Sequence, residues 1–398
     1  MKQAIKKKSF MKPSVASIKE KLGLSIKTEA DLVKSSADKP IEFIQMPEAF
    51  SDALKLPGIA CGYTTICTGW SNTGKSTIKN CLIASCIRSG ILPVLYETEN
   101  NFDWQFALDC GVPAEPVYGD VEVEDVDPET GEVTGTHVEK RIIDYKSDLL
   151  YFDNDILAET YGDNDYSTGK KTKTKRKVAV IEEIAYSMNE ILDMQDNGEI
   201  QQPICFIWDS VGSISSYKSY ASKTGNNMFD AAAISAAFSP LINSRIPASK
   251  KVSREFTNTF FCVNKIWNDS MNSMGGAPSI ELKGGRTMTF GARLIIHLGG
   301  VAKAATKKLS AVAKGETYNY GIVSKIRVTK NQLPMPYNVL YDSEIACVHN
   351  GLVSPDRLEE YKKNYMKNIL AKLEDMNNGL KIEESDIQFK ESEEEGEF

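Results

Sequence analysis

The fold of this chain is decided by one stretch, Gly69-Trp70-Ser71-Asn72-Thr73-Gly74-Lys75-Ser76-Thr77. Four free positions separate its two glycines, and Lys and Ser follow at once, which is the pattern of a phosphate-binding loop. Residues 62–68 before it are typical of a buried strand, and residues 78–89 after it are typical of a helix. Backbone N–H groups at the start of such a helix point at a bound polyphosphate. The sequence therefore predicts a site for a nucleoside triphosphate.

The residues of this loop have separate expected parts in binding ATP and Mg²⁺. Lys75 would place its charge on the β and γ oxygens, and the Ser76 hydroxyl would hold the metal. The alternative is a chance glycine-rich turn, but strand, loop and helix follow one another here in the required order. The residues expected to line the phosphate site are Gly69, Ser71, Asn72, Thr73, Gly74, Lys75, Ser76 and Thr77.

The composition is that of a soluble globular protein with one large domain and appendages. The 398 residues include 47 basic and 54 acidic side chains, and 41% are hydrophobic. No apolar run reaches the length of a membrane span, and the basic N-terminus lacks the apolar core of a signal peptide. The 8 cysteines show no paired metal-ligand spacing. They suit buried, reduced side chains, so we expect a cytoplasmic protein with no membrane partner.

Charge is spread unevenly along the chain, although its formal net value is −7. Residues 2–12 and 170–177 are strongly basic, whereas residues 115–139 hold nine acids without a Lys or Arg. Local basic surfaces for nucleic acid are therefore compatible with an acidic protein. Residues 383–398 hold eight acids and one Lys, and we expect them to form a detached, disordered tail.

Strands alternate with helices along most of the chain, which predicts an α/β fold with a mostly parallel, helix-flanked sheet. We expect an N-terminal helical and linker segment at 1–45 that packs on another subunit, a core at 46–353 and a helical region at 354–382. The core is interrupted by an expected surface insertion at about 113–177, which contains a β-hairpin. A further strand is expected at 337–341.

Acids at the ends of two apolar strands complete a candidate site for ATP hydrolysis. Asp209 follows the strand at 203–208 and could hold Mg²⁺ through water. Glu99 follows the strand at 91–96, where a carboxylate could orient the water that attacks the γ-phosphate. Glu97 competes with Glu99 for that role, and a solvated acid at a strand end is the alternative.

Taken together, these segments resemble the RecA-type recombinases, and the phage UvsX proteins in particular, over about residues 46–355 outside the insertion. Where the family has an apolar strand, an acid, a small residue and the catalytic Glu, this chain has residues 94–99. The resemblance therefore assigns the catalytic role to Glu99. It also implies that Asp103 contacts the adenine amino group and that Phe106 packs on the base.

Two positions that sense the nucleotide depart from the family pattern. Lys265 follows Asn264 where the family usually has Gln or His, so a fixed charge would reach the phosphate. The family commonly reaches across a subunit interface to the neighbour's ATP with two cations. Lys330 keeps the first cation, whereas Gln332 replaces the second. The resemblance thus implies a catalytic role for Lys330. We expect one for Lys265 as well, and Lys325, Arg327 or Lys265 could substitute for the missing second cation.

Two loops fall where the family binds DNA, at 216–228 and 266–286. Their cations could meet phosphates, and their apolar side chains could wedge between bases. The alternative for either loop is a flexible Gly/Ser/Asn connector. The expected DNA contacts are Lys218, Lys223, Met228, Met274, Ile280, Lys283, Gly284, Gly285 and Arg286.

The resemblance implies an ATP-dependent recombinase that forms a helical homo-oligomeric filament on single-stranded DNA and pairs it with homologous duplex DNA. It also implies partners among single-strand-binding and mediator proteins, and a host cytoplasm if the chain is encoded by a phage. Two alternatives stay open, a ring helicase of the DnaB kind and a regulatory RecA-fold ATPase that never touches DNA. The chain lacks the large helical N-terminal domain of the former, while its acidic pI and two departures keep the latter open.

Overall fold

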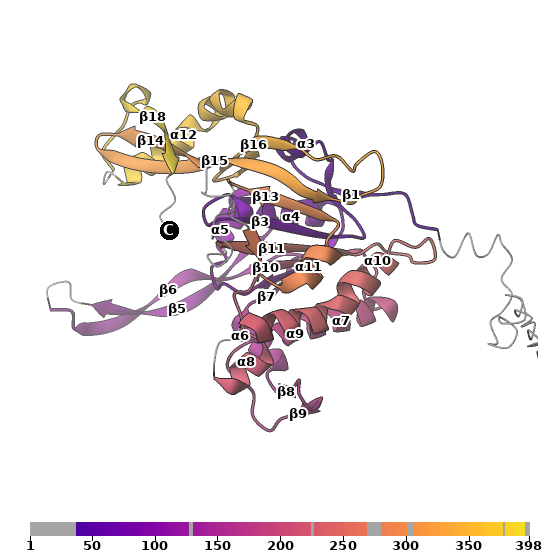
Figure 1. Cartoon of the computed structure of the whole chain (residues 1–398). Coiled ribbons are helices and arrows are strands. Elements are labelled where there is room, and N and C mark those ends of the chain that lie inside the picture. Colours follow the sequence, from indigo (N-terminus) through magenta and orange to yellow (C-terminus); the bar gives the residue numbers. More distant parts are fainter. Residues whose placement is uncertain are drawn as a thin grey trace, which may run out of the picture.

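The computed structural model describes residues 37–126, 130–223, 227–268, 280–300, 306–376 and 379–394. Most of the predicted N-terminal segment, Met274 and the last four residues of the expected acidic tail lie outside this part of the chain. Within it, twelve strands form one α/β sheet with helices on both faces (Figure 1). No helix in the described ranges is both long and apolar enough to cross a membrane.

The centre of the sheet is parallel, as the alternation of strands and helices predicts. Its strands are buried on both faces, so they read as continuous apolar runs in the sequence. β10, for example, is buried at every position. Across the sheet the order is β13 (Leu294–Leu298), β3 (Thr64–Gly69), β11 (Thr259–Asn268), β10 (Ile204–Val211), β4 (Leu92–Glu97) and β7 (Leu150–Phe152).

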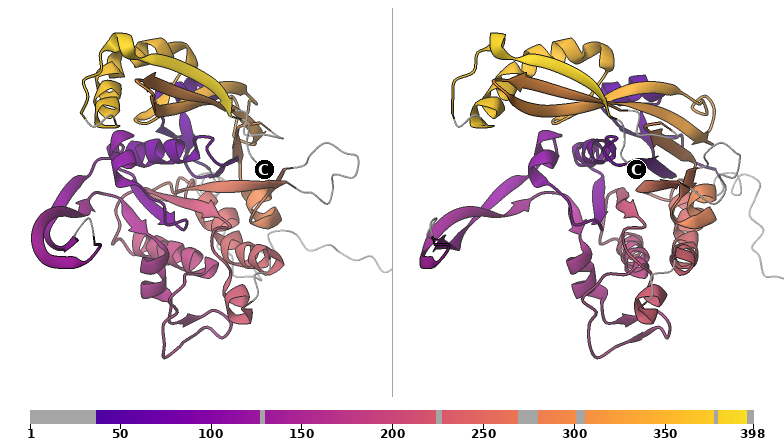
Figure 2. Two further views of the ribbon diagram at one scale, coloured as in Figure 1. Left: turned by 90° about the vertical axis from the view of Figure 1, so that its left-hand side faces the viewer. Right: turned by 60° about the vertical axis from the view of Figure 1, so that its left-hand side comes forward.

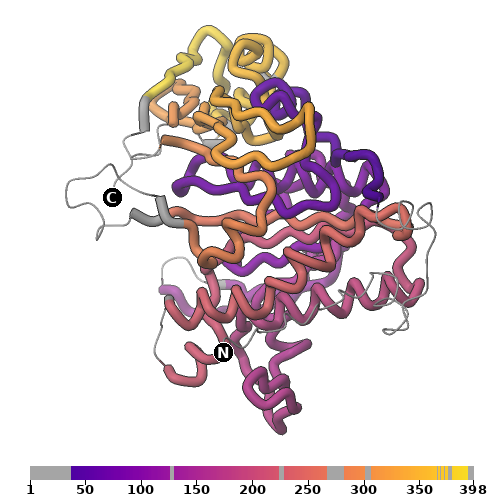
Figure 3. Tube along the Cα trace, turned by 45° about the vertical axis from the view of Figure 1, so that its right-hand side comes forward, coloured from indigo at the N-terminus to yellow at the C-terminus, as the bar shows by residue number. Residues whose placement is uncertain are grey.

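Alternate side chains of β10 belong to two separate cores. Cys205 and Ile207 face the core under α4 (Lys75–Arg88), and Phe206 and Trp208 face the opposite core. That second core is closed by α7 (Ile181–Asp196) and α9 (Asn227–Pro240), which lie side by side along the sheet (Figure 3). Burial on both faces leaves the carboxyl ends of the strands as the place where polar residues meet solvent.

An antiparallel unit extends the sheet beyond β13. The long strand β15 (Glu316–Asn331) pairs with β13 and with two strands of its own unit, and α12 (Leu358–Met376) packs on it. A third core joins Tyr320 to Ile369 and Leu373 of this helix. Figure 2 shows the unit stacked on one side of the parallel strands. The other strands of the unit are β14 (Thr306–Ala313), β16 (Asp342–Val348), β17 (Gly351–Val353) and β18 (Gln388–Glu394).

The expected detached tail is in part a strand of this unit, which corrects the sequence prediction. β18 pairs antiparallel with β14, so residues 388–394 are ordered. Phe389 supplies the physical reason, since its ring lies 5.9 Å from that of Tyr320 and 5.2 Å from Lys362 Nζ. Composition alone predicts disorder for a run of acids. Here the packing of one aromatic side chain, Phe389, holds the segment as a strand.

The predicted hairpin is confirmed, but the expected insertion is not wholly outside the core. β5 (Glu115–Val126) and β6 (Val133–Lys146) pair and project from the body of the protein (Figure 1). β7 and α6 (Asn154–Tyr161), by contrast, follow the hairpin and join the core. β7 adds an edge strand beside β4, where Phe152 stacks on Tyr96 at 5.3 Å.

The strand expected at 337–341 is wrong, because the chain there is a loop and the strand begins at β16. The amide of Asn331 donates to the carbonyls of Tyr337 and Val339 at 2.8 and 2.9 Å, so a side chain takes the acceptors a strand would use. The remaining elements are short: β1 (Phe43–Gln45), α3 (Glu48–Leu54), β2 (Gly58–Ala60), α5 (Trp104–Asp109), β8 (Asn164–Asp165), β9 (Lys170–Lys171), α8 (Tyr217–Ser222), a π-helical turn (Leu241–Arg245), α10 (Ile246–Ala248), β12 (Ile280–Leu282), α11 (Gly285–Gly291) and two 3-10 turns (Pro355–Arg357 and Glu384–Asp386).

The substitution Phe389→Ala should lower the free energy of unfolding by about 2 kcal/mol, because the ring is partly buried against the third core. Chemical denaturation of both proteins measures the change. Lys390→Ala on the same strand is the matched control, since Lys390 is exposed. Equal stability of the Phe389 variant and the parent would mean that β18 is not held by this contact.

Candidate functional site

The phosphate-loop residues connect β3 directly to α4. β3 ends at Gly69, and α4 begins at Lys75 with Gly74 as its N-cap. Gly74 has a φ of 94°, and a Cβ at this position would lie 2.3 Å from Sγ of Cys347. Only glycine fits this approach of the loop to β16.

The loop and the strand-end acids surround one cavity of about 510 Å³. Strand ends of the parallel sheet form its floor, and the antiparallel unit forms a wall that the sequence did not indicate. Lys308 on β14 and Asn319 on β15 belong to that wall. The lining residues are Ser71, Asn72, Thr73, Gly74, Lys75, Ser76, Thr77, Glu99, Asn101, Asp209, Val263, Lys265, Lys308, Asn319, Gly321, Ile322 and Cys347.

Lys75 is held against the start of its own loop. Its ammonium donates to the carbonyl of Gly69 at 2.9 Å and to the carbonyl of Trp70. Burial lowers the pKa of this lysine, although nearby acidic groups oppose the shift. Gly69 thus contributes its carbonyl to the Lys75 contact and does not line the cavity itself.

Asp209 forms a buried ion pair that sequence reasoning missed. Its Oδ2 lies 2.7 Å from Nζ of Lys79, and both side chains are less than a tenth exposed. Lys79 lies one helical turn after Lys75 on α4, and its ammonium is 5.2 Å from the ring centroid of Phe102. The sequence does contain one sign of this ion pair, since Lys79 lies among apolar residues of a helix. It does not identify the partner, because Asp209 lies 130 positions later.

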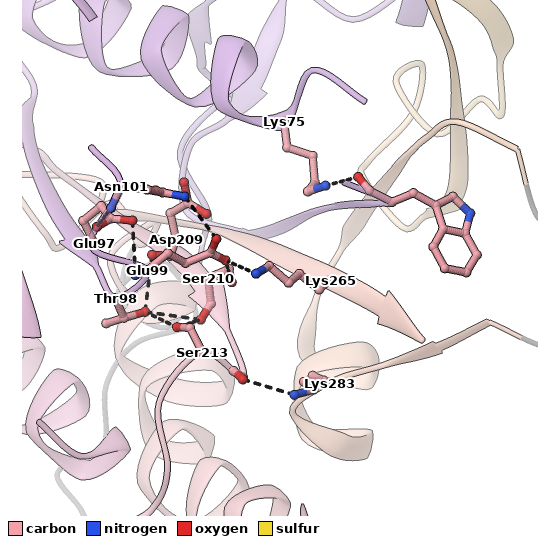
Figure 4. A network of polar contacts seen from close by, with 12 residues as sticks. Lys75, Glu97, Thr98, Glu99, Asn101, Asp209, Ser210, Ser213, Lys265 and Lys283 are labelled. Atoms are coloured by element: carbon pink, nitrogen blue, oxygen red, sulfur yellow. Dashed lines mark hydrogen bonds and ion pairs between the residues drawn. The ribbon is translucent and has the colours of Figure 1, made fainter. Parts of the chain in front are cut away.

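Glu99 points into the cavity and is surrounded by donors (Figure 4). Its Oε1 lies 3.0 Å from Lys265 Nζ and accepts a hydrogen bond from the Ser210 hydroxyl. The amide of Asn101 donates to Oε2 at 3.4 Å. Burial favours the neutral acid, but Ser210 and Lys265 outweigh it and lower the pKa of Glu99 below its ordinary value. The carboxylate is therefore ionised at neutral pH.

Glu97 has a structural role, although the sequence left it as an alternative to Glu99 for orienting the attacking water. Its side chain is fully buried and accepts from the backbone N–H groups of Glu99 at 3.2 Å and Asn101 at 3.1 Å. Burial raises the pKa of Glu97. It orders the turn after β4 and does not line the cavity, so the geometry favours Glu99 as the acid that reaches a ligand.

The two residues expected at the adenine lie outside this cavity. Asp103 is the N-cap of α5, where its carboxylate accepts from the backbone N–H of Phe106 at 3.1 Å. Phe106 packs beside the core under α4. Neither side chain lines the cavity around the phosphate loop.

Lys330 also lies away from the phosphate loop of its own chain. Its ammonium donates to the carbonyls of Thr289 and Phe290 at 2.8 and 3.0 Å, at the end of α11. With Arg286 it lines a second cavity, of about 630 Å³. A contact of Lys330 with a neighbouring subunit's nucleotide stays a prediction.

The first candidate DNA loop contains the short helix α8. Lys218 lies 4.2 Å over the ring of Phe229, and Lys223 ends the helix in a left-handed conformation. Met228 is 74% exposed, as a side chain that wedges between bases would have to be. All three residues are exposed.

The second candidate loop is described at residues 266–268, which end β11, and again from residue 280 onward. Ile280 begins β12, and Gly284 and Gly285 have φ of 95° and 67°, which starts α11. Lys283 turns inward, since its ammonium donates to the Gly212 carbonyl at 3.1 Å. Arg286 is exposed. The inward contact of Lys283 differs from the expected phosphate contact and joins this loop to the exit of β10.

The substitution Lys79→Met should lower the free energy of unfolding by about 3–5 kcal/mol, because it leaves the buried charge of Asp209 without its partner. The double variant Lys79→Met with Asp209→Asn should recover most of that loss. Thermal and chemical denaturation measure both. Additive losses in the double variant would contradict a coupled pair.

Comparison of the chain with models of known protein families and with curated proteins finds no match. The resemblance to RecA-type recombinases therefore rests on the motifs quoted above. The function has to be argued from the side chains around the cavity, from their contacts and from the surfaces beside them.

Proposed function

We propose that this protein is a DNA-dependent ATPase of the RecA type that assembles on single-stranded DNA and promotes strand exchange with homologous duplex DNA. One observation carries the proposal. The phosphate loop, the ionised Glu99 and Asp209 line a single cavity at the carboxyl edge of the parallel sheet. That arrangement suits phosphoryl transfer to water, because it joins a polyphosphate cradle to a carboxylate that can orient the nucleophile.

The residues fit ATP and Mg²⁺. The phosphate loop lines the cavity, where its backbone N–H groups could bind phosphate oxygens. Lys75 lines the same cavity, so its ammonium could exchange its carbonyl partners for phosphate oxygens. Ser76 and Asp209 line the same cavity and supply the oxygen ligands that Mg²⁺ prefers. The metal would neutralise charge on the phosphates. Lys79 holds one oxygen of Asp209, so it would also fix the orientation of this carboxylate.

Glu99 is the proposed acceptor for the water proton. Ser210 and Lys265 hold one of its oxygens in place, and its lowered pKa keeps it charged. Lys265 would then have two roles, because its ammonium restrains Glu99 and also lines the cavity proposed to hold the γ-phosphate. A cation at this position replaces the neutral side chain that the family usually carries.

A polar network supports coupling between the ATP site, the carboxyl end of β10 and the second candidate DNA loop (Figure 4). Ser210 joins Glu99 to the exit of β10, where Thr98 and Ser213 share a hydrogen bond. Lys283 donates to Gly212 in the same turn. Asn264 holds the backbone of Lys283 with two hydrogen bonds, of 2.6 and 3.1 Å. DNA that moved the second loop would act on the partners of Glu99 through this network, and the first loop follows the end of β10 directly in the chain.

The sheet order is compatible with the proposed RecA-like core. β3 carries the phosphate loop and β10 carries Asp209, and β11 lies between them. The ends of β10 and β11 lead into the two loops proposed to bind single-stranded DNA. Lys330 lies apart from its own phosphate loop, and in a helical filament it would serve the ATP of the next subunit.

The substitution Glu99→Gln should bind ATP but reduce the rate of hydrolysis by at least about 100-fold, because it removes the carboxylate that accepts the proton. Single-turnover hydrolysis and equilibrium nucleotide binding measure the two effects. Glu97→Gln is the control, since Glu97 contacts backbone N–H groups and does not line the cavity. A full rate in Glu99→Gln together with a loss in Glu97→Gln would reverse the assignment.

The substitution Lys265→Met should shift the acid limb of the kcat profile to higher pH. Lys265 lowers the pKa of Glu99 by a hydrogen bond and by its charge, so its removal raises that pKa and protonates the carboxylate earlier as pH falls. Lys363→Met on α12 is a control with an exposed lysine. An unmoved acid limb in Lys265→Met would mean that Glu99 does not govern the profile.

A further inference from the structure

A dense run of basic residues lies on a loop that does not line the cavity of the ATP site. Residues 163–177 carry six basic side chains and two acids. We call residues 170–177 the basic loop. Its lysines are all exposed. The loop begins with β9 and lies with β8 near α8, at the opposite end of the protein from α12 (Figure 1).

One arginine anchors the basic loop to the core. The side chain of Arg176 is 7% exposed, forms an ion pair with Glu183 on α7 and donates to the carbonyl of Asn164 at 2.6 Å. Its guanidinium lies 5.6 Å from the ring centroid of Tyr166 and 5.0 Å from that of Tyr217. The loop is thus a positioned element, since its backbone is tied down at one end by several contacts.

The same contacts join the basic loop to the first candidate DNA loop. Tyr217 is the first residue of α8, and its ring lies 5.9 Å from that of Tyr166. The backbone N–H of Tyr217 donates to Glu182 at 2.9 Å, and Glu182 precedes the acid that holds Arg176. Neighbouring acids at the start of α7 therefore position both loops, and the two surfaces are contiguous.

The lysines of the basic loop differ in their contacts. Lys171 pairs with Asp163 at 2.7 Å, and Lys175 donates to the Glu159 carbonyl. Lys170, Lys173 and Lys177 form no ion pair with an acid among the described residues, so they are available for a ligand. Three lysines spread over eight residues suit a row of phosphates.

The composition of the loop decides which nucleic acid it fits. Residues 167–175 hold only Ser, Thr, Gly and Lys, so no side chain there can stack on a base. Proteins that bind a single strand combine a basic groove with side chains on which the bases stack. A duplex presents stacked bases inside and two rows of phosphates outside, which lysines contact without regard to sequence.

We infer that the basic loop binds the phosphate backbone of duplex DNA next to the site of the single strand. The inference rests on the proposed function, because it assigns the second DNA of strand exchange to a particular surface. Lys170, Lys173 and Lys177 contact the phosphates, and Arg176 positions the loop.

The test compares the full-length protein with the triple variant Lys170→Gln, Lys173→Gln, Lys177→Gln. Binding to a fluorescein-labelled duplex of mixed sequence is measured over a series of salt concentrations. The slope of log K against log salt is negative, and its magnitude should decrease by about 0.9 for each lost phosphate contact and by about 2.7 for all three. Single-strand-stimulated ATP hydrolysis should stay at the parent level. The matched control is the triple variant Lys363→Gln, Lys367→Gln, Lys381→Gln, whose lysines are exposed in and after α12.

The outcomes separate this inference from the proposed function. A slope equal to that of the parent, or a parent protein that binds no duplex, overturns the inference even if single-strand stimulation is present. Loss of self-association without DNA in the basic-loop variant, seen by sedimentation, also overturns it, because the loop then binds an acidic surface of a second copy. A reduced slope without single-strand stimulation of ATP hydrolysis would support the duplex site and contradict the proposed function.

Discussion

Burial of both faces of the parallel strands is the constraint on which the rest of this structure depends. Apolar side chains of β10 alternate between two cores, so its first polar groups in contact with the cavity stand at its carboxyl end. β3 and β4 obey the same rule and deliver the phosphate loop and Glu99 to the same edge. The site is therefore a consequence of packing, since hydrophobic burial leaves these polar residues one place to meet.

Three carboxylates at that edge are distinguished by their partners. Glu97 is satisfied by backbone N–H groups, Asp209 by the ammonium of Lys79, and Glu99 by Ser210 and Lys265. Glu97 thus shapes a turn and Asp209 is fixed to the phosphate-loop helix. Glu99 keeps a charge that faces the cavity. The different roles of the three carboxylates therefore follow from their hydrogen-bond and ion-pair partners more than from their positions in the sequence.

The sequence predicted the elements that depend on local pattern. The phosphate loop and the apolar strands around it follow from residues close together in the chain, whereas local pattern left Glu97 and Glu99 as alternatives and only the resemblance chose Glu99. Long-range pairing escaped prediction, because Lys79 meets an aspartate 130 positions away and β18 finds β14 through Phe389. The short strand β7 was read as insertion, since three residues carry too little pattern to reveal an edge strand.

The most direct test of the account is the rate of ATP hydrolysis with and without single-stranded DNA, with negative-stain imaging of the same samples. We expect strong stimulation by DNA and helical filaments that require ATP. Stimulation with closed rings would contradict the filament and favour a helicase. Turnover that ignores DNA, without any polymer, would contradict the coupling between Glu99 and the DNA loops on which the account rests.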